Sequence, residues 1–382
     1  MKSEVNVPDY MNRALRIFAG KAMREPGIEA VVLTDPRDIF YLTGMREGIQ
    51  SLIIKSDEIV IITHRMFEDE AIEICPHCRV IVTSKDPKER PNIYQFTINF
   101  LSKEKLRKAA VDAARMTHQA FDEMQYHARQ TDTDIHPIPE ITTEVRAIKD
   151  DFEIALTRRC IEVAESAFRK LLDQGAGFMI GKTEKEIAWT MEAYMREAGA
   201  DRQGFPGTGL IVASGPNSAG VHPKPGNRVI REGEVVLIDW GAEIDEYRSD
   251  STRTVFPGTL PEWARKAYPV VLGAHMASVE CLRDGALIQS ADLVARNFIK
   301  DAGYEEFQYG VGHGVGLQIH EAPWIRATST EKFKTGMVTT IEPGIYLPGT
   351  GGIRIEDMYH IQKDGSEIMG NLTRSLEDMV VS

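Results

Sequence analysis

The sequence predicts an α+β protein of two domains: an N-terminal α/β domain, then a larger domain of helices and mainly antiparallel strands. The chain has 382 residues, enough for two domains at roughly 150 residues each. Its first third alternates short β-rich runs with amphipathic helical patterns, which is typical of an α/β domain. Beyond Gly204, Gly and Pro become frequent and β-rich runs recur, which indicates a second, different sheet.

In the N-terminal part, short apolar runs predict strands and longer periodic stretches predict helices. The predicted strands are residues 29–33, 51–54, 59–63, 79–83 and 108–113. The predicted helices are residues 10–24, 91–101 and 116–129. The segment 131–139 is mostly polar and holds two prolines, so it predicts a boundary between domains 1–138 and 139–382.

In the C-terminal part, apolar residues on one face predict a helix through Leu172, with Gly175 as its stop. Thr183 and Glu186 have the spacing of a capping box before a second helix, which runs to Ala198. Two later periodic stretches predict helices over residues 261–282 and 290–302. The predicted strands are residues 209–214, 234–242, 247–255, 337–346 and 353–361.

The composition narrows the class of protein. Lys and Arg number 45 and Asp and Glu number 57, a formal net charge of −12 that disfavours nucleic acid or an anionic membrane as a partner. No apolar run approaches the ~18 residues of a membrane helix, and the first residues do not resemble a signal peptide. We therefore expect a soluble cytoplasmic protein. The surplus of acids raises the question of whether any of them is buried.

One acid interrupts an apolar strand. Asp239 lies in the run 235–241, where an ionised carboxylate is unfavourable unless it is paired or bound to a cation. Asp250 follows eleven residues later, beyond a polar, turn-like stretch. A hairpin centred on Ile244 and Asp245 would place the two acids opposite each other, with Cβ atoms ~4.5–5.5 Å apart. Because two bare carboxylates at that distance repel each other, a cation between them is expected.

The same arrangement recurs downstream. Glu342 and Glu356 each lie in an apolar run, and a hairpin centred near Gly349 would pair them. Between the two hairpins, His313 lies among alternating glycines, which allow close approach of the backbone. Four carboxylates and one imidazole suit two metal ions ~3.5–4 Å apart that share a water or hydroxide. Oxygen-rich coordination favours Mn or Co over a thiolate zinc site.

A simpler explanation is that each acid forms a salt bridge, with Arg253 or Arg354 pairing Asp239 or Glu356. For one acid alone that explanation is favoured. Four acids in two matched hairpins beside a glycine-flanked histidine favour the metal pair instead. The motif from Cys75 to Cys78 follows a helical pattern rather than opening a helix, so we assign it no redox or zinc function.

These residues resemble the metallopeptidases of the pita-bread fold, namely aminopeptidase P, prolidase and, more distantly, methionine aminopeptidase. The matching segments are SGPNSAGVH, IDWGAEIDEYRSDSTRT, GHGVGLQIHEAP, TIEPGIY and GGIRIED, in that order from Ser214 to Asp357. A separate N-terminal domain is similar to that of aminopeptidase P, prolidase and creatinase. The chain departs from the family pattern at Val221, where Pro is usual, and at Glu246, where Gly is usual.

The resemblance implies a function for each matching residue. As metal ligands it implies Asp239, Asp250, His313, Glu342 and Glu356, with Asp250 and Glu356 bridging two ions. Glu342 would also assist the nucleophilic water as base. Beyond the ligands, it implies that His222 and His320 contact the substrate or steady the tetrahedral intermediate, and that Arg354 supports the substrate and acid geometry.

We therefore expect hydrolysis of the peptide bond before proline, by a Xaa-Pro dipeptidase or an aminopeptidase P, with a metal-bridging hydroxide as nucleophile. The expected metal is Mn, with Co or Zn as alternatives. The expected substrate is a small peptide with proline in the second position, and a homodimer is expected. One alternative is a hydrolase or lyase of the same fold that acts on a small non-peptide amide or zwitterion. The other is a non-catalytic binding protein on this scaffold, although the full ligand set disfavours it.

Overall fold

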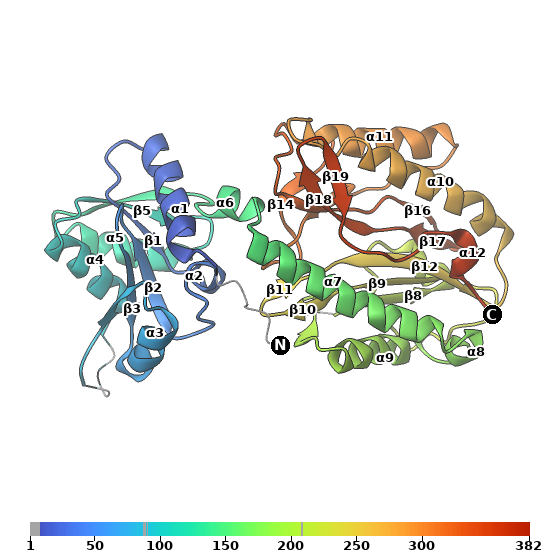
Figure 1. Cartoon of the computed structure of the whole chain (residues 1–382), viewed down its shortest axis with the longest axis horizontal. Helices are drawn as coiled ribbons and strands as arrows, with labels where there is room; N and C mark the ends of the chain where they lie inside the picture. The colour runs from blue at the N-terminus through green and yellow to red at the C-terminus, as the bar shows by residue number, and fades with distance from the viewer. Residues whose placement is uncertain (1–7, 87–88, 90, 208) are drawn as a thin grey trace. The chain divides into compact units, whose positions relative to one another are not determined.

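The computed structural model describes residues 8–86, 89, 91–207 and 209–382. The chain divides into two compact units, residues 1–145 and 146–382 (Figure 1). Among the described residues, no helix has both the length and the apolar character needed to cross a bilayer.

The first unit is built on a mixed six-stranded sheet with the strand order β4-β3-β2-β1-β5-β6. The central strand β1 pairs antiparallel with β2 and parallel with β5. The strands are β1 (Ala30–Leu33), β2 (Ile49–Ile54), β3 (Ile59–Thr63), β4 (Arg79–Val82), β5 (Lys108–Asp112) and β6 (Asp134–Ile138).

Helices cover both faces of this sheet because its inner strands are apolar on both faces. Ala30 and Val32 share one core with residues of α4 and α5. The intervening Val31 and Leu33 are also buried, on the opposite face. The helices are α1 (Tyr10–Arg24), α2 (Pro36–Thr43), α3 (Glu68–Ile74), α4 (Ile93–Lys103) and α5 (His118–Ala128), with a short turn η1 (Arg65–Phe67).

The segment 131–139, predicted from its composition as a domain boundary, contains the edge strand β6. Pro137 lies in this strand opposite Val111 of β5. An edge strand tolerates proline because one of its sides has no neighbouring strand, so the missing backbone N–H breaks no hydrogen bond there. The polar, proline-containing composition therefore marks the edge of the first unit's sheet. Helix α6 (Thr143–Ala147) follows it.

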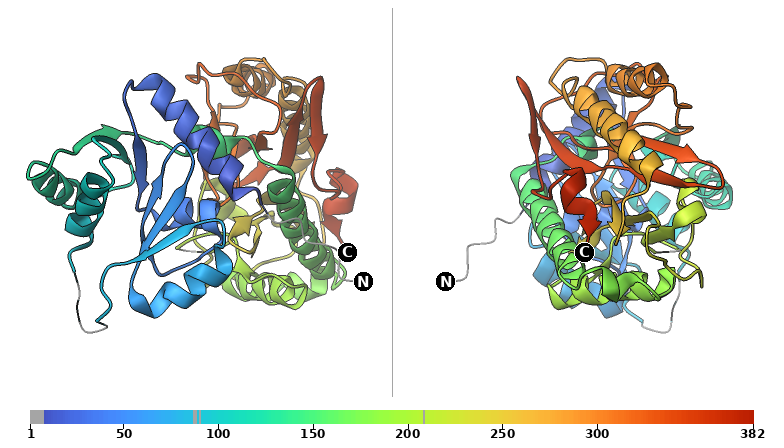
Figure 2. Two further views of the ribbon diagram at one scale, coloured as in Figure 1. Left: turned by 60° about the vertical axis from the view of Figure 1, so that its left-hand side comes forward. Right: turned by 90° about the vertical axis from the view of Figure 1, so that its right-hand side faces the viewer.

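The second unit places its strands between two helical layers, with α7 and α9 on one side and α10 and α11 on the other (Figures 1 and 2). Its core includes Trp240, whose indole stacks on Phe168 of α7 with ring centroids 4.4 Å apart. The capping boxes that open α7 and α9 use Asp150 with Glu153 and Thr183 with Glu186. The helices are α7 (Asp151–Leu172), α8 (Ala176–Met179), α9 (Glu184–Glu197), η2 (Gly215–Ala219), α10 (Glu262–Val279), α11 (Ile288–Asp301) and α12 (Leu376–Met379).

Four groups of strands form the sheets of this unit, in the orders β20-β12-β9-β8, β14-β13-β15-β18-β19, β11-β10-β7 and β16-β17. Their bounds are β7 (Arg202–Gln203), β8 (Ile211–Ser214), β9 (Val236–Trp240), β10 (Ala242–Ile244), β11 (Tyr247–Arg248), β12 (Ser251–Pro257), β13 (Gly312–Gly314), β14 (Glu321–Ile325), β15 (Val338–Ile341), β16 (Gly344–Leu347), β17 (Gly351–Arg354), β18 (Asp357–Gln362), β19 (Gly365–Ile368) and β20 (Val380–Val381).

The first predicted hairpin exists, but its register differs from the prediction. Ile244 pairs with Tyr247, so the turn lies at Asp245 and Glu246 rather than at Ile244 and Asp245. Asp239 consequently faces Thr252 and not Asp250. Because side chains alternate with a period of two, this shift of two residues keeps both acids on one face of the sheet, as diagonal neighbours.

The second predicted hairpin has the expected centre. Tyr346 pairs with Gly352 in the β16–β17 ladder, and Ile341 pairs with Asp357 in the β15–β18 ladder, so both ladders are centred on Gly349. The pairing of the hairpin is interrupted between these two ladders. The same register places Glu342 opposite Glu356. At the interruption, the backbone of Glu356 turns to Thr252 in an isolated bridge, which joins the second hairpin to the first.

Candidate metal centre

The structure brings together the four predicted carboxylates and the predicted histidine. Asp239 lies in β9, His313 lies in β13, and Glu342 directly follows β15. Asp250 and Glu356 lie between consecutive strands of their hairpins. Each is buried except Glu342, which is half-buried. The strands of both hairpins and the glycine-rich segment therefore converge on one acidic cluster.

Three overlapping groups in this cluster offer ligand atoms that lie within 4.8 Å of one another. Asp250, His313 and Glu356 each belong to two groups, and of these three only the two carboxylates have a second ligand oxygen. The groups are Asp239, Asp250 and Glu356; His313, Glu342 and Glu356; and Asp250, His313 and His320.

The hydrogen bonds of the carboxylates leave buried oxygens for a cation. Asp239 Oδ2 accepts from Arg354 Nη2 at 2.6 Å, and Glu356 Oε2 accepts from the Thr252 hydroxyl at 2.7 Å. Within the described part of the chain, Asp239 Oδ1, Asp250 Oδ1 and Glu356 Oε1 are buried without a hydrogen-bond partner. Buried anionic oxygens without donors are unfavourable, so this donor set fits divalent cations.

Burial raises the pKa of the Asp250 and Glu356 carboxyls well above its usual range, and neighbouring carboxylates add to the effect. Burial also raises the pKa of Asp239, against the opposing charge of Arg354. Glu342 differs: burial would raise its pKa, but the His313 hydrogen bond and charge, with Arg354, lower it overall. Without a cation, the ionised forms of Asp239, Asp250 and Glu356 are therefore less favourable than those of exposed acids.

His313 presents one nitrogen to the acids. Its Nδ1 lies 3.1 Å from the carbonyl oxygen of Gly314, which can only accept, so in the neutral ring the proton is on Nδ1. Nε2, 3.6 Å from Asp250 Oδ2 and 3.4 Å from Glu342 Oε1, then keeps its lone pair for a metal. A side chain at Gly312 or Gly314 would collide with the carbonyl oxygens of Thr340 or Ala322, which explains these glycines.

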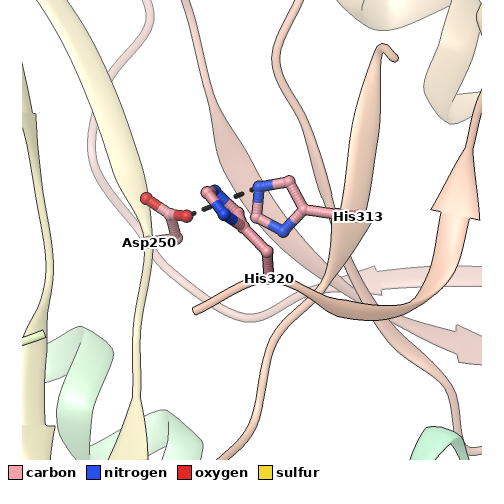
Figure 3. A group of neighbouring side chains, drawn as sticks. All are labelled: Asp250, His313 and His320. Carbon is pink, nitrogen blue, oxygen red and sulfur yellow. Dashed lines mark ion pairs between the residues drawn. The ribbon is translucent and has the colours of Figure 1, made fainter. Parts of the chain in front are cut away.

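The two outer histidines approach this cluster without being enclosed by it. Figure 3 shows the rings of His320 and His313 and the Asp250 carboxylate directed toward one another. The two rings meet edge to face with centroids 4.3 Å apart. Burial, then the nearby His313 charge, lowers the pKa of His320 to about 4, so its imidazole is neutral at pH 7. His222 is exposed, and it lies close enough for its charge to oppose the raised pKa of Asp239 and to add to the lowering of the pKa of His320.

Arg354 connects the acids to the rest of the site. Besides binding Asp239, its guanidinium donates to the Tyr346 hydroxyl at 2.9 Å and to the Val221 carbonyl at 3.1 Å. The salt bridge weighed as the simpler explanation therefore exists for Asp239. Arg253, in contrast, pairs with Asp357 at 2.6 Å and donates to the backbone carbonyl of Glu356.

Sequence reasoning missed Thr252 and Tyr346. Thr252 hydrogen-bonds Glu356, and Tyr346 bonds both Arg354 and Tyr309, the latter at an O–O distance of 2.7 Å. Both were detectable by period-two alternation, because each shares a hairpin face with a predicted ligand.

Among the described residues, the groups that can hold a metal contain neither Cys75 nor Cys78. Cys75 is buried and its thiol donates to the Thr43 carbonyl at 3.4 Å.

Comparison with known proteins gives two family matches. Residues 155–363 match metallopeptidase family M24, and residues 19–148 match the creatinase/prolidase N-terminal domain. An uncharacterized peptidase of Staphylococcus saprophyticus is 33% identical over 89% of this chain and 94% of its own length.

Two solved structures cover nearly the whole chain. A Xaa-Pro dipeptidase from Bacillus anthracis has a TM-score of 0.88 at 28% identity and covers 96% of this chain and 99% of its own. An X-Pro aminopeptidase from Thermotoga maritima has a TM-score of 0.83 at 29% identity and covers 93% and 99%.

Proposed function

Because the chain belongs to metallopeptidase family M24, we propose that it is a metal-dependent peptidase that cleaves the bond before proline. The observation that carries the proposal is the convergence of four acids and His313, with three buried carboxylate oxygens free of donors within the described residues. The similar structures from Bacillus anthracis and Thermotoga maritima, named as a dipeptidase and an aminopeptidase, support Xaa-Pro peptides as the substrate class.

In this proposal two divalent ions, Mn in the first instance and Co or Zn as alternatives, are held by the predicted ligands. Asp250 and Glu356 would serve both ions, because each belongs to two of the ligand groups and has two carboxylate oxygens, whereas His313 offers a single nitrogen. The ligands are Asp239, Asp250, His313, Glu342 and Glu356.

When bound, such ions lower the pKa of a water and polarise the scissile carbonyl. The remaining tasks belong to side chains. Glu342, whose pKa is lowered overall although its burial opposes this, is ionised at neutral pH and can accept the proton of the attacking water. Neutral His320 can donate a hydrogen bond to the oxygen that becomes negative. We assign contact with the substrate to the exposed His222, and Arg354 would hold Asp239 in position through its hydrogen bond.

A proline amide offers no N–H for recognition, so its ring must be recognised by shape and apolar contact. Trp324 is 40% exposed and lies directly opposite His313 in the β13–β14 ladder. Paired residues of a ladder project to the same face of the sheet. We therefore assign Trp324 as an apolar surface against which the proline ring packs.

A manganese-supplemented assay tests the proposal, with one Xaa-Pro dipeptide, one Xaa-Pro tripeptide and matched Xaa-Ala peptides as controls. We expect cleavage of proline substrates only. Cleavage of the dipeptide alone identifies a dipeptidase, and cleavage of both identifies an aminopeptidase. A metal-loaded protein that leaves every proline peptide intact but hydrolyses a small cyclic amide would instead support the non-peptide alternative.

The homodimer and the cytoplasmic location expected from the sequence stay predictions. Sedimentation velocity of the metal-loaded chain tests the first, and fractionation of the source cells tests the second.

A further inference from the structure

We propose that Glu184 is a positioning residue that holds the His222 loop, residues 214–226, and through it His222. This inference rests on the proposed function, because His222 is assigned a task only there. Glu184 is the first residue of α9 and is 1% exposed. A carboxylate buried to this extent must satisfy its oxygens locally.

Glu184 satisfies its oxygens with donors from both ends of the loop. At the first end, Oε1 accepts from the backbone N–H of Ser214 at 2.8 Å and from its hydroxyl at 2.9 Å. At the second end, Oε2 accepts from the N–H of Gly226 at 2.9 Å. The amide of Asn217 adds a donor at 3.1 Å from Oε1. Charge-assisted bonds of this kind are stronger than neutral ones, so the carboxylate clamps the base of the loop.

Two other roles for Glu184 are already filled by neighbouring residues. The capping box of α9 uses Thr183 and Glu186, so the helix does not need Glu184 as its cap. The nearby cation Arg228 is bound by Glu234 at 2.5 and 2.7 Å. The hydrogen bonds of Glu184 therefore go to the loop.

The tip of the loop is held separately, against the second hairpin. Gly352 N–H donates to the Ser218 hydroxyl at 2.8 Å, and Arg354 donates to the carbonyl of Val221, the residue before His222. With its base fixed by Glu184 and its tip fixed by Arg354, the loop leaves His222 little freedom of position. Exposed loops without such ties sample several conformations.

The test replaces Glu184 by Gln, which keeps the shape but removes the charge and two acceptor sites. We expect kcat/KM for a Xaa-Pro dipeptide to fall roughly ten- to a hundredfold, the effect of misplacing a catalytic group. Metal content should not change, and amide exchange in residues 214–226 should become faster. Glu197→Gln, an exposed change at the other end of the same helix, is the matched control and should alter neither property.

A double-mutant cycle separates positioning from general destabilisation. If Glu184 acts through His222, then Glu184→Gln should have little further effect on kcat/KM in a His222→Ala background. Asn217→Ala removes a single donor to Glu184 and should reproduce the loss of kcat/KM and the faster exchange in milder form. This second variant tests the inference if Glu184→Gln does not fold.

Additive losses in the double variant, or unchanged loop exchange in Glu184→Gln and Asn217→Ala, would overturn the inference. A wild-type protein that binds metal but cleaves no Xaa-Pro peptide would contradict the proposed function instead. In that case the exchange measurement still decides whether Glu184 holds the loop.

Discussion

Among single residues, Glu356 combines deep burial with an oxygen that has no donor in the described chain. Burial, with neighbouring acids, raises its pKa in the folded protein well above the unfolded value. At pH 7 this acid therefore destabilises the metal-free fold, and below about pH 4 the penalty vanishes because both states are protonated. Glu356→Gln keeps an acceptor for Thr252, so in EDTA at pH 7 we expect it to be more stable by about 1–3 kcal/mol. Urea unfolding measures this difference.

The same substitution should abolish manganese binding and Xaa-Pro cleavage, since Glu356 belongs to two ligand groups. Glu342→Gln is the matched control. The pKa of Glu342 is lowered overall, despite its burial, by His313 and Arg354, so its charge stabilises the metal-free fold at pH 7. Its replacement should therefore destabilise the metal-free protein. Destabilisation of the metal-free protein by both variants would contradict this account of the cluster.

His275 is a buried histidine whose protonation affects the fold rather than the proposed reaction. Its ring lies between the Ile355 carbonyl and the Tyr359 hydroxyl, and burial lowers its pKa to about 4. As the pH falls, the imidazole therefore becomes protonated in the unfolded chain before it does so in the folded protein. The free energy of unfolding should decrease between pH 6.5 and 4, by about 3 kcal/mol in total.

His275→Gln should flatten this loss of stability, measured as urea midpoints across that pH range in EDTA. The exposed His118→Gln serves as control and should leave the pH dependence unchanged. An equally steep loss in His275→Gln would assign the acid sensitivity to other groups.

At the scale of elements, the turn of the first hairpin contains backbone strain. Asp245 and Glu246 have φ values of 48° and 67°, a region in which non-glycine side chains crowd the backbone. Glu246 lies in an ion pair with Arg202 at 3.4 Å, but that pair is exposed and contributes little. We expect Glu246→Gly to stabilise the protein by about 1 kcal/mol. A rise in Tm with unchanged activity would support this, and a fall would show that the contacts of Glu246 outweigh the strain.

The same turn explains why the register of the first hairpin could not be read from the sequence. The second hairpin was centred correctly on Gly349 because LPGTGG marks its turn with Pro and Gly. In the first hairpin, the turn residues Asp245 and Glu246 carry no such mark, and the prediction placed the turn one residue early. The acids nevertheless fell on the correct face, because pairing partners changed by two residues, a whole period of the strand.

Contacts between distant segments were beyond sequence reasoning. The bridge between Thr252 and Glu356 joins elements about a hundred residues apart, and so do four hydrogen bonds of Arg253. The alternation of side chains along a strand identifies the face of the sheet on which a residue lies. It does not identify which other hairpin packs against that face. The ligand types were therefore predictable, whereas the residues that hold them in place were not.

For the whole molecule, the two compact units differ in what a metal can do to them. Each unit has its own apolar core, and all five proposed ligands lie in residues 146–382. A ligand stabilises only the unit whose folded state binds it, by about 2.7 kcal/mol at a hundred times its Kd. Adding Mn²⁺ to the EDTA-treated chain should therefore slow amide exchange in the strands β9, β12 and β15 and leave β1 and β5 unchanged. Glu356→Gln should remove the effect, and equal protection of both units would contradict the assignment of the metal centre to the second unit.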